Sequence, residues 1–249
     1  MRYLPAILCL FAMLLGMARA QEIKKWPALV ADGFDFPVGK PDGENYYKAR
    51  GYRANGHLGE DWNGKRGGDT DLGDPVYSCA NGLVLFAENF GHGWGNVVII
   101  RHVYEEDGQH KYVDSLYGHL DRILTRYGLH VRRGQQIGTI GTGGGLYEAH
   151  LHFELRKDLR VGMARHRFPR DDRTYWDPTS FILAHRKLTT TTPTTQIPVN
   201  TFVEFALTTM VDGPADAEHG FVLPAGGGGP PVKSDWHPDR FDDEPKKRK

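Results

Sequence analysis

The sequence predicts a mostly β domain built from antiparallel sheets, and three observations carry this prediction. Between residues 76 and 155, short apolar runs recur and glycines separate them, as in a series of strands joined by tight turns. No run in that stretch has the 3.6-residue apolar period of an amphipathic helix. Strands without intervening helices disfavour a doubly wound α/β fold. The length of 249 residues suits one domain of moderate size with attached tails.

The predicted strands are rich in β-branched and aromatic residues, and they lie at residues 82–86, 96–102, 112–117, 136–140 and 149–155. Residues 75–80 are strand-like as well, and we expect Cys79 there to be a buried apolar side chain and not a nucleophile. One short helix is expected at residues 120–127. Residues 21–51 should hold loops and one short edge strand, because glycines and prolines interrupt any helical pattern. Residues 170–183 should pack back onto the sheet and close the domain.

The first 20 residues have the parts of a secretory signal peptide. Arg2 supplies the basic start, residues 4–15 are apolar, and Ala18-Arg19-Ala20 resembles a small-x-small cleavage site. We expect the mature chain to begin at Gln21. An uncleaved amphipathic or membrane anchor is the alternative, but the apolar stretch is shorter than the roughly 20 residues of a comfortable bilayer span.

Loss of that segment changes the charge and the cysteine count. Removing Arg2 and Arg19 leaves 29 of the 31 basic residues against 31 acidic ones, a net charge of −2, which gives no reason to expect nucleic acid binding. Cys9 leaves too, so the mature chain keeps only Cys79 and forms no internal disulfide. We expect an exported monomer, periplasmic or extracellular with the periplasm favoured, without stable insertion in the membrane.

Low-complexity composition marks residues 188–249 as a disordered tail. Residues 188–195 are rich in threonine and residues 225–231 in glycine and proline. Between them, residues 199–210 are apolar enough to pack, and their spacing fits a strand and a helix equally well. The basic residues 246–249 are expected to be solvated. The expected organisation is therefore a signal peptide (1–20), a folded domain (21–187) and a tail (188–249).

Two histidines share one face of the predicted strand at residues 149–155. Side chains alternate along a strand, so His150 and His152 project together while Leu151 and Phe153 face the core. The glycine-rich residues 141–145 predict a flexible loop leading into this strand. Two ordinary histidines on a polar face are the alternative to a metal-binding or catalytic pair.

A second candidate pair is His57 and Asp61. A spacing of four puts both side chains on one face of an extended segment or of a helix turn, and Gly56 and Gly59 disfavour the helix. A hydrogen-bonded surface pair is the simplest interpretation. Catalytic zinc, however, commonly takes three protein ligands from histidine and carboxylate and keeps a fourth position open. His57, Asp61 and one histidine of the doublet would meet that requirement.

A third motif contains His119, which follows a predicted strand and by itself could be a structural cap. In this order, the three motifs resemble those of the lysostaphin-type (LytM-like) zinc endopeptidases, whose members mostly cut peptide bonds of bacterial cell-wall peptidoglycan. The matching motifs are His57-x-Gly59-x-Asp61, Tyr117-x-His119-Leu120 and His150-Leu151-His152-Phe153-Glu154. Supporting similarity lies in residues 73–77, 94–99, 134–138 and 177–178, so the resemblance covers about residues 34–183.

The resemblance implies a fold, a cofactor and a reaction. The implied fold is the antiparallel β-sheet groove of the duplicated hybrid motif, with a motif core at residues 53–156. It implies one zinc ion held by His57, Asp61 and His152, with His119 and His150 as catalytic histidines; which of the two is the general base stays open. The implied reaction is hydrolysis of peptidoglycan cross-link peptides. Family members often use a tyrosine near the first motif, for which Tyr47 and Tyr52 are candidates.

Other catalytic signatures are absent from the sequence. It has no His-Glu-x-x-His motif, no serine hydrolase elbow, and no Pro-Cys-x-x-Cys after residues 152–154. The remaining histidines are expected to be structural or solvated. Two other functions are possible on the same residues: a non-catalytic envelope protein that binds or activates a cell-wall hydrolase, and a secreted peptidase against glycine-rich proteins. Degenerate relatives typically lose metal ligands, so five occupied positions favour the enzyme.

Overall fold

The computed structural model describes residues 22–91 and 93–204, and the predicted signal peptide and residues 205–249 lie outside this range. Its strands are β1 (Lys25–Leu29), β2 (Tyr46–Arg50), β3 (Glu60–Gly64), β4 (Pro75–Tyr77), β5 (Gly82–Gly91), β6 (Gly95–Glu106), β7 (Gln109–Leu120), β8 (Arg122–Ile123), β9 (His130–Val131), β10 (Gln136–Thr139), β11 (Leu151–Arg156), β12 (Tyr175–Trp176) and β13 (Thr194–Pro198). The helical elements are α1 (Pro178–Ala184) and two single turns, η1 (Gly39–Gly43) and η2 (Arg165–Arg167).

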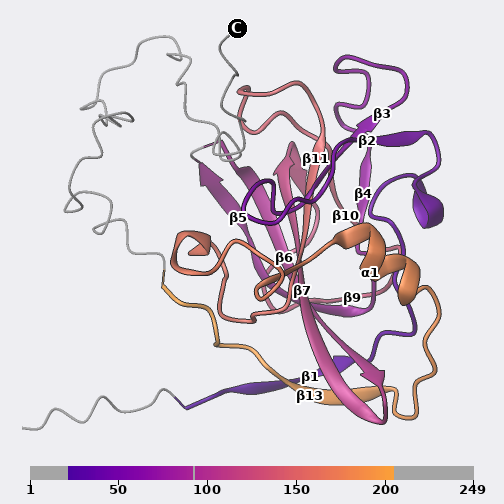
Figure 1. Cartoon of the computed structure of the whole chain (residues 1–249), viewed down its shortest axis with the longest axis vertical. Coiled ribbons are helices and arrows are strands. Elements are labelled where there is room, and N and C mark those ends of the chain that lie inside the picture. Colours follow the sequence, from indigo (N-terminus) through magenta and orange to yellow (C-terminus); the bar gives the residue numbers. More distant parts are fainter. Residues whose placement is uncertain (1–21, 92, 205–249) are drawn as a thin grey trace, which may run out of the picture.

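The strands form one large sheet and two small ones (Figure 1). The large sheet has the order β2-β3-β11-β7-β6-β5-β9, and β12 pairs with β11 beside that path. The smaller sheets are β4-β10-β8 and β1-β13, the latter at the bottom of the view. All pairings between these strands are antiparallel. The predicted mostly β, antiparallel class is therefore confirmed.

Both faces of the large sheet are buried. On one face, Ile100 and Tyr117 pack into the main core with Val76 of β4, Ile137 of β10 and Phe181 of α1. On the other face, the residues that pack against the β1-β13 pair are Leu83, Leu85 and Val103. Strands buried on both faces have near-continuous apolar sequences, which explains the run at residues 97–100 in β6.

The prediction of a helix at residues 120–127 is wrong. Strand β7 runs through Leu120, and β8 follows at once and pairs with β10, with Ile123 opposite Gly138. Pairing with a strand outside the local sequence satisfies the backbone there, and such tertiary pairing overrides local propensity. The buried position predicted for Cys79 is confirmed, and burial raises the pKa of its thiol to about 12.

The only α-helix among the described residues is α1. Asp177 caps its N-terminus, since the side-chain oxygen accepts a hydrogen bond from Ser180 N–H at 2.8 Å, and Pro178 occupies the first turn. Phe181 and Ile182 face the main core, so residues 170–183 pack onto the sheet as expected. No helix in residues 22–91 and 93–204 has the length and apolar character to cross a membrane.

Strands β1 and β13 are among those that the composition did not predict. Residues 21–51 hold β1 as well as β2, and β1 pairs with β13, so the prediction of a disordered tail is wrong for this part of residues 188–249. The irregular segment after β13 is bound to the large sheet: the buried guanidinium of Arg101 donates to Pro198 O at 2.7 Å and to Thr201 Oγ1 at 2.9 Å. The chain therefore stays packed on the sheet through this segment.

Candidate metal centre

The centre begins with two neighbouring strands of the large sheet. Asp61 of β3 lies directly opposite His152 of β11, so both side chains leave the same face of the sheet. The distance from Asp61 Oδ1 to His152 Nδ1 is 2.8 Å. Leu151 and Phe153, which alternate with His152, are buried in the main core. The predicted alternation along this strand is confirmed.

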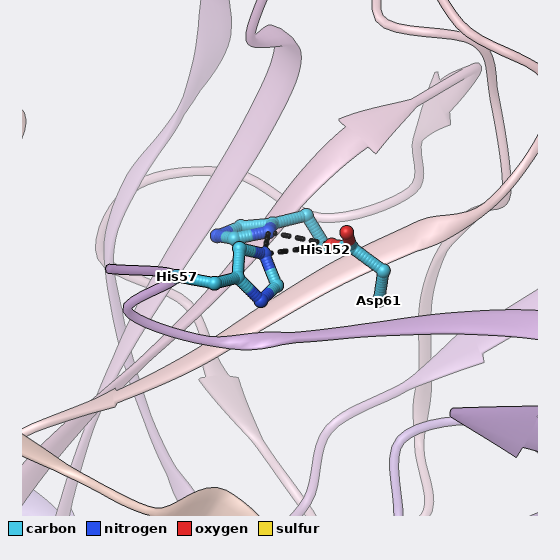
Figure 2. Close-up of side chains that lie close together, drawn as sticks. All are labelled: His57, Asp61 and His152. Atoms are coloured by element: carbon cyan, nitrogen blue, oxygen red, sulfur yellow. Dashed lines mark hydrogen bonds and ion pairs between the residues drawn. The ribbon is translucent and has the colours of Figure 1, made fainter. Parts of the chain in front are cut away.

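His57 reaches this pair because Gly59 has no side chain. A Cβ at position 59 would lie 2.5 Å from Phe153 O and 3.1 Å from His152 Cε1, closer than real Cβ atoms approach a backbone oxygen. The segment before β3 therefore passes directly over β11. His57 Nε2 lies 3.2 Å from Asp61 Oδ1 and 3.2 Å from His152 Nδ1 (Figure 2).

The three converging atoms carry too few protons for all the close contacts between them to be hydrogen bonds. His57 Nδ1 lies 3.1 Å from Gly51 O, and a carbonyl oxygen only accepts, so a neutral His57 keeps its proton there and turns a lone pair on Nε2 towards the centre. Asp61 Oδ1 is an acceptor as well. At most one proton, on His152 Nδ1, could serve all three atoms. A cation in the centre would satisfy every lone pair, so these residues fit a metal ion.

Asp61 contributes a negative charge to the centre. Burial by itself raises the pKa of this carboxyl, but hydrogen bonds from the His152 and His57 rings, and their positive charge when they are protonated, hold the pKa well below its usual range. Asp61 is 4% exposed, His57 3% and His152 0%. The centre is thus a buried site with a carboxylate at neutral pH, and two nitrogens and one oxygen are ligands that zinc accepts.

A bulge in β7 directs His119 towards the centre. The pairing of β6 with β7 changes register between Asn96 and Val98, so Gly118 and His119 together face one residue, Val97. His119 has φ of 62°, in the left-handed region that non-glycine residues rarely adopt, and its N–H donates to Trp94 O at 2.9 Å. Bulges re-aim a side chain and are frequent beside functional sites.

His150 lies just before β11, on the same side as His152. Its Nδ1 lies 2.8 Å from Glu148 O, so a neutral ring carries its proton there and has a lone pair on Nε2, 3.8 Å from Asp61 Oδ1. The His119 ring is close to both, with its centroid 4.8 Å from that of His150 and 5.6 Å from that of His152. Four imidazoles and one carboxylate therefore form a single cluster.

Comparison with known proteins agrees with this geometry. The model of the family described as Peptidase family M23 matches residues 56–164, which contain all five clustered side chains. The lipoprotein NlpD of Yersinia enterocolitica is 40% identical over 84 residues, which are 34% of this chain and 78% of that protein. This chain belongs to peptidase family M23. The resemblance to the lysostaphin-type peptidases is thereby confirmed.

Two other relatives of the M23 chain have names that point to different activities. The peptidoglycan DD-endopeptidase ShyB of Vibrio cholerae is 39% identical over 88 residues, and the murein hydrolase activator NlpD of Escherichia coli is 38% identical over 84 residues. Each match covers 34% of this chain, but only 18% of ShyB and 20% of that NlpD. The M23 chain thus spans about a fifth of the length of these two relatives.

The M23 structure brings together all five predicted site residues: His57, Asp61, His119, His150 and His152. Within the described residues, neither tyrosine candidate makes a hydrogen bond or ring contact with these five side chains. The Tyr52 hydroxyl donates to Asp172 Oδ1 at 2.7 Å, and Tyr47 is 46% exposed on β2.

Tyr147, Trp94 and Arg50 also contact the cluster, and none of these contacts was predicted. The Tyr147 ring lies 4.8 Å from that of His119, and the Trp94 ring stacks on His119 at 6.1 Å and meets His152 edge-on at 5.4 Å. Arg50 Nη1 lies 3.7 Å from Asp61 Oδ2, the oxygen on the far side of the carboxylate from the histidines. Nothing in their sequence spacing marks them, because each reaches the centre from a separate segment.

Proposed function

We propose that this chain is an exported, zinc-dependent endopeptidase that hydrolyses peptide bonds in peptidoglycan cross-links. One observation carries the proposal: His57 Nε2, Asp61 Oδ1 and His152 Nδ1 converge on one point, with His119 and His150 beside it. Convergent ligands alone would suit a structural zinc site. Two further histidines with no place among the ligands are what a hydrolytic site needs for moving protons.

The proposed roles follow from the hydrogen bonds at each ring. Bound zinc is a Lewis acid that polarises a scissile carbonyl and makes water acidic enough to react near neutral pH. His150 would accept a proton at Nε2, since its Nδ1–H is held by Glu148 O. His119 would donate a hydrogen bond to the developing oxyanion or a proton to the leaving amine. The two histidines could exchange these roles, because their rings are neighbours.

The proposal also covers location and organisation. Residues 1–20 would be a cleaved signal peptide and residues 21–187 the peptidase domain, to which β13 of the following segment adds a strand. The mature chain would act as a monomer on peptidoglycan peptides in the periplasm or outside the cell, without binding nucleic acid. The name of the relative ShyB, a peptidoglycan DD-endopeptidase, supports this substrate class.

The alternative is a non-catalytic protein that activates a cell-wall hydrolase. The name of the E. coli relative, murein hydrolase activator NlpD, favours it. The two functions make different demands on the centre. An activator needs a binding surface and not a metal with proton-carrying groups, so the five-residue cluster favours the enzyme.

The deciding experiment uses the purified mature chain loaded with zinc. We expect about one zinc per chain and release of new amino groups from purified sacculi. The variant H119A should keep its zinc and lose about 10²- to 10⁴-fold in rate, the usual contribution of a proton-transferring side chain. If the zinc-loaded chain cleaves neither sacculi nor simple peptides but stimulates a separate cell-wall hydrolase, the activator is the correct function.

A further inference from the structure

A second carboxylate lies on the far side of the His152 ring. Glu154 is two residues further along β11 and therefore on the same face of the sheet as His152. Glu154 Oε1 is 3.0 Å from His152 Nε2, while Asp61 Oδ1 is 2.8 Å from His152 Nδ1. Both Glu154 and His152 are 0% exposed. A neutral imidazole has one proton, so the two carboxylates compete for it.

Glu154 is held firmly in place by arginines. Arg156 Nε donates to Glu154 Oε2 at 2.6 Å, and Arg156 Nη2 lies at 2.6 Å from the same oxygen. Arg165 Nη1 lies 3.6 Å from Glu154 Oε1. A charge-assisted hydrogen bond from Arg156 Nε, with a second guanidinium nitrogen close to the same oxygen, holds Oε2 on the arginine side of the carboxylate. Oε1 consequently stays aimed at His152.

The anchoring continues into the segment behind the strand. Arg156 Nη1 donates to Gly162 O, and a Cβ at Gly162 would lie 2.9 Å from Phe202 Cγ, so Phe202 packs directly on that glycine. Phe202 also packs against the buried residues of the second face of the sheet. Glu154 is thus anchored by residues that are not themselves metal ligands.

Which ring nitrogen of His152 carries the proton decides whether the centre can bind a metal ion. With the proton on Nδ1, His152 would donate to Asp61 and its lone pair would point away from His57. With the proton on Nε2, the Nδ1 lone pair joins those of His57 and Asp61. A carboxylate that accepts the outer N–H of a ligating histidine fixes this tautomer and the ring orientation.

We infer, building on the proposed function, that Glu154 is a positioning residue: it accepts the Nε2–H of His152 before any metal binds and so leaves Nδ1 as the metal-binding atom. His152 would then bind through Nδ1 and His57 through Nε2. Arg156 keeps the Glu154 carboxylate aimed at the ring.

The test is zinc affinity in the isosteric variant E154Q, measured by competition with a chelator. The amide fills the same space, but whichever way it turns, its NH₂ group faces a donor, either Arg156 or His152 Nε2–H. We expect zinc affinity to fall by about 10- to 100-fold, the usual effect of removing such an outer partner. Affinity equal to that of the wild type would overturn the inference.

A matched control is E60Q. Glu60 is also 0% exposed and lies next to Asp61, but it bonds to Trp62 Nε1 at 3.2 Å and to Thr179 N–H at 3.2 Å and makes no described contact with His152. E60Q should lower the unfolding temperature and leave zinc affinity unchanged. An equal loss of affinity in E60Q would show that any buried charge change disturbs the centre, and it would also overturn the inference.

A measurement on the wild type is independent of whether E154Q folds. The ¹⁵N spectrum of the histidine rings in the metal-free protein, recorded above the ordinary histidine pKa, should show His152 protonated on Nε2 alone. Protonation on Nδ1, or on both nitrogens, contradicts the inference. Failure of the proposed function gives a different result: the tautomer and zinc affinity would be as expected, yet sacculi would not be cleaved.

Discussion

Two clusters of buried polar side chains, each containing histidine, lie on opposite faces of the large sheet. They differ in whether every hydrogen-bond donor is matched by an acceptor. On the core face, His102 Nδ1 lies 2.8 Å from Asn81 O and its Nε2 lies 2.7 Å from Ser115 Oγ. Ser115 Oγ is 3.1 Å from the Tyr117 hydroxyl, which accepts from Cys79 N–H at 2.9 Å. In this His102 network each donor meets an acceptor.

The metal centre has the opposite arrangement. Three acceptor atoms, from His57, Asp61 and His152, share at most one proton. Burial lowers the pKa of His102 to about 4, partly opposed by the Asn81 carbonyl, whereas hydrogen bonds from the imidazoles, and their positive charge when protonated, keep the pKa of Asp61 low against the effect of burial. One cluster excludes charge and the other retains it. Burial of a histidine therefore does not reveal a metal site, but a surplus of acceptors does.

The largest effect that would sharpen this comparison is the loss of a ligand. Structural zinc sites bind with about 10–16 kcal/mol, so one of three or four ligands accounts for about 3–4 kcal/mol, and H152A should weaken zinc binding by about 10²- to 10³-fold. The control H102Q, in the other cluster, should keep its zinc. Isothermal titration or chelator competition measures both. A similar loss in both variants would remove the distinction between the clusters.

The second effect concerns acid. The pKa of His102 is lowered from 6.5 to about 4, so as the pH falls through this window the unfolded chain takes up a proton that the folded chain does not. Stability contributed by the neutral ring is complete above pH 6.5 and should fall by about 3 kcal/mol towards pH 4. Urea unfolding of the metal-free protein measures it. H102Q should lose less stability over the same range, and parallel curves for the two proteins would contradict the assignment.

The smallest effect tests how His57 reaches the centre. In G59A the added Cβ would meet Phe153 O at 2.5 Å, so the variant should lose about 1–3 kcal/mol of stability through overpacking, and zinc should bind less tightly as His57 moves away. G51A is the matched control, because a Cβ at Gly51 meets nothing within 4 Å and the accepting carbonyl stays. Thermal unfolding and chelator competition should separate the two; equal behaviour would mean that close approach at Gly59 is unimportant.

Local patterns predicted most of the sheet and the members of the centre. The strands with alternating or continuous apolar runs were expected within a few residues of their bounds, because period-two alternation is a property of the strand itself. The prediction of a helix at residues 120–127 failed because β8 forms through its pairing with β10, which the local sequence does not show. Strand β13 was missed for the same reason, since its partner β1 lies at the other end of the folded chain and threonine-rich composition does not reveal it.

The sequence by itself determined which side chains could form the centre. His150 and His152 had to share a face because they are two apart on a strand, and three motifs in order supplied His57, Asp61 and His119. Only the tertiary structure decided how they work together: which nitrogen of each ring faces the centre, the bulge that turns His119 inward, and the Glu154 carboxylate behind His152. The physical reason is that a proton's position and a side chain's direction depend on partners from other strands, and those partners meet only after the chain has folded.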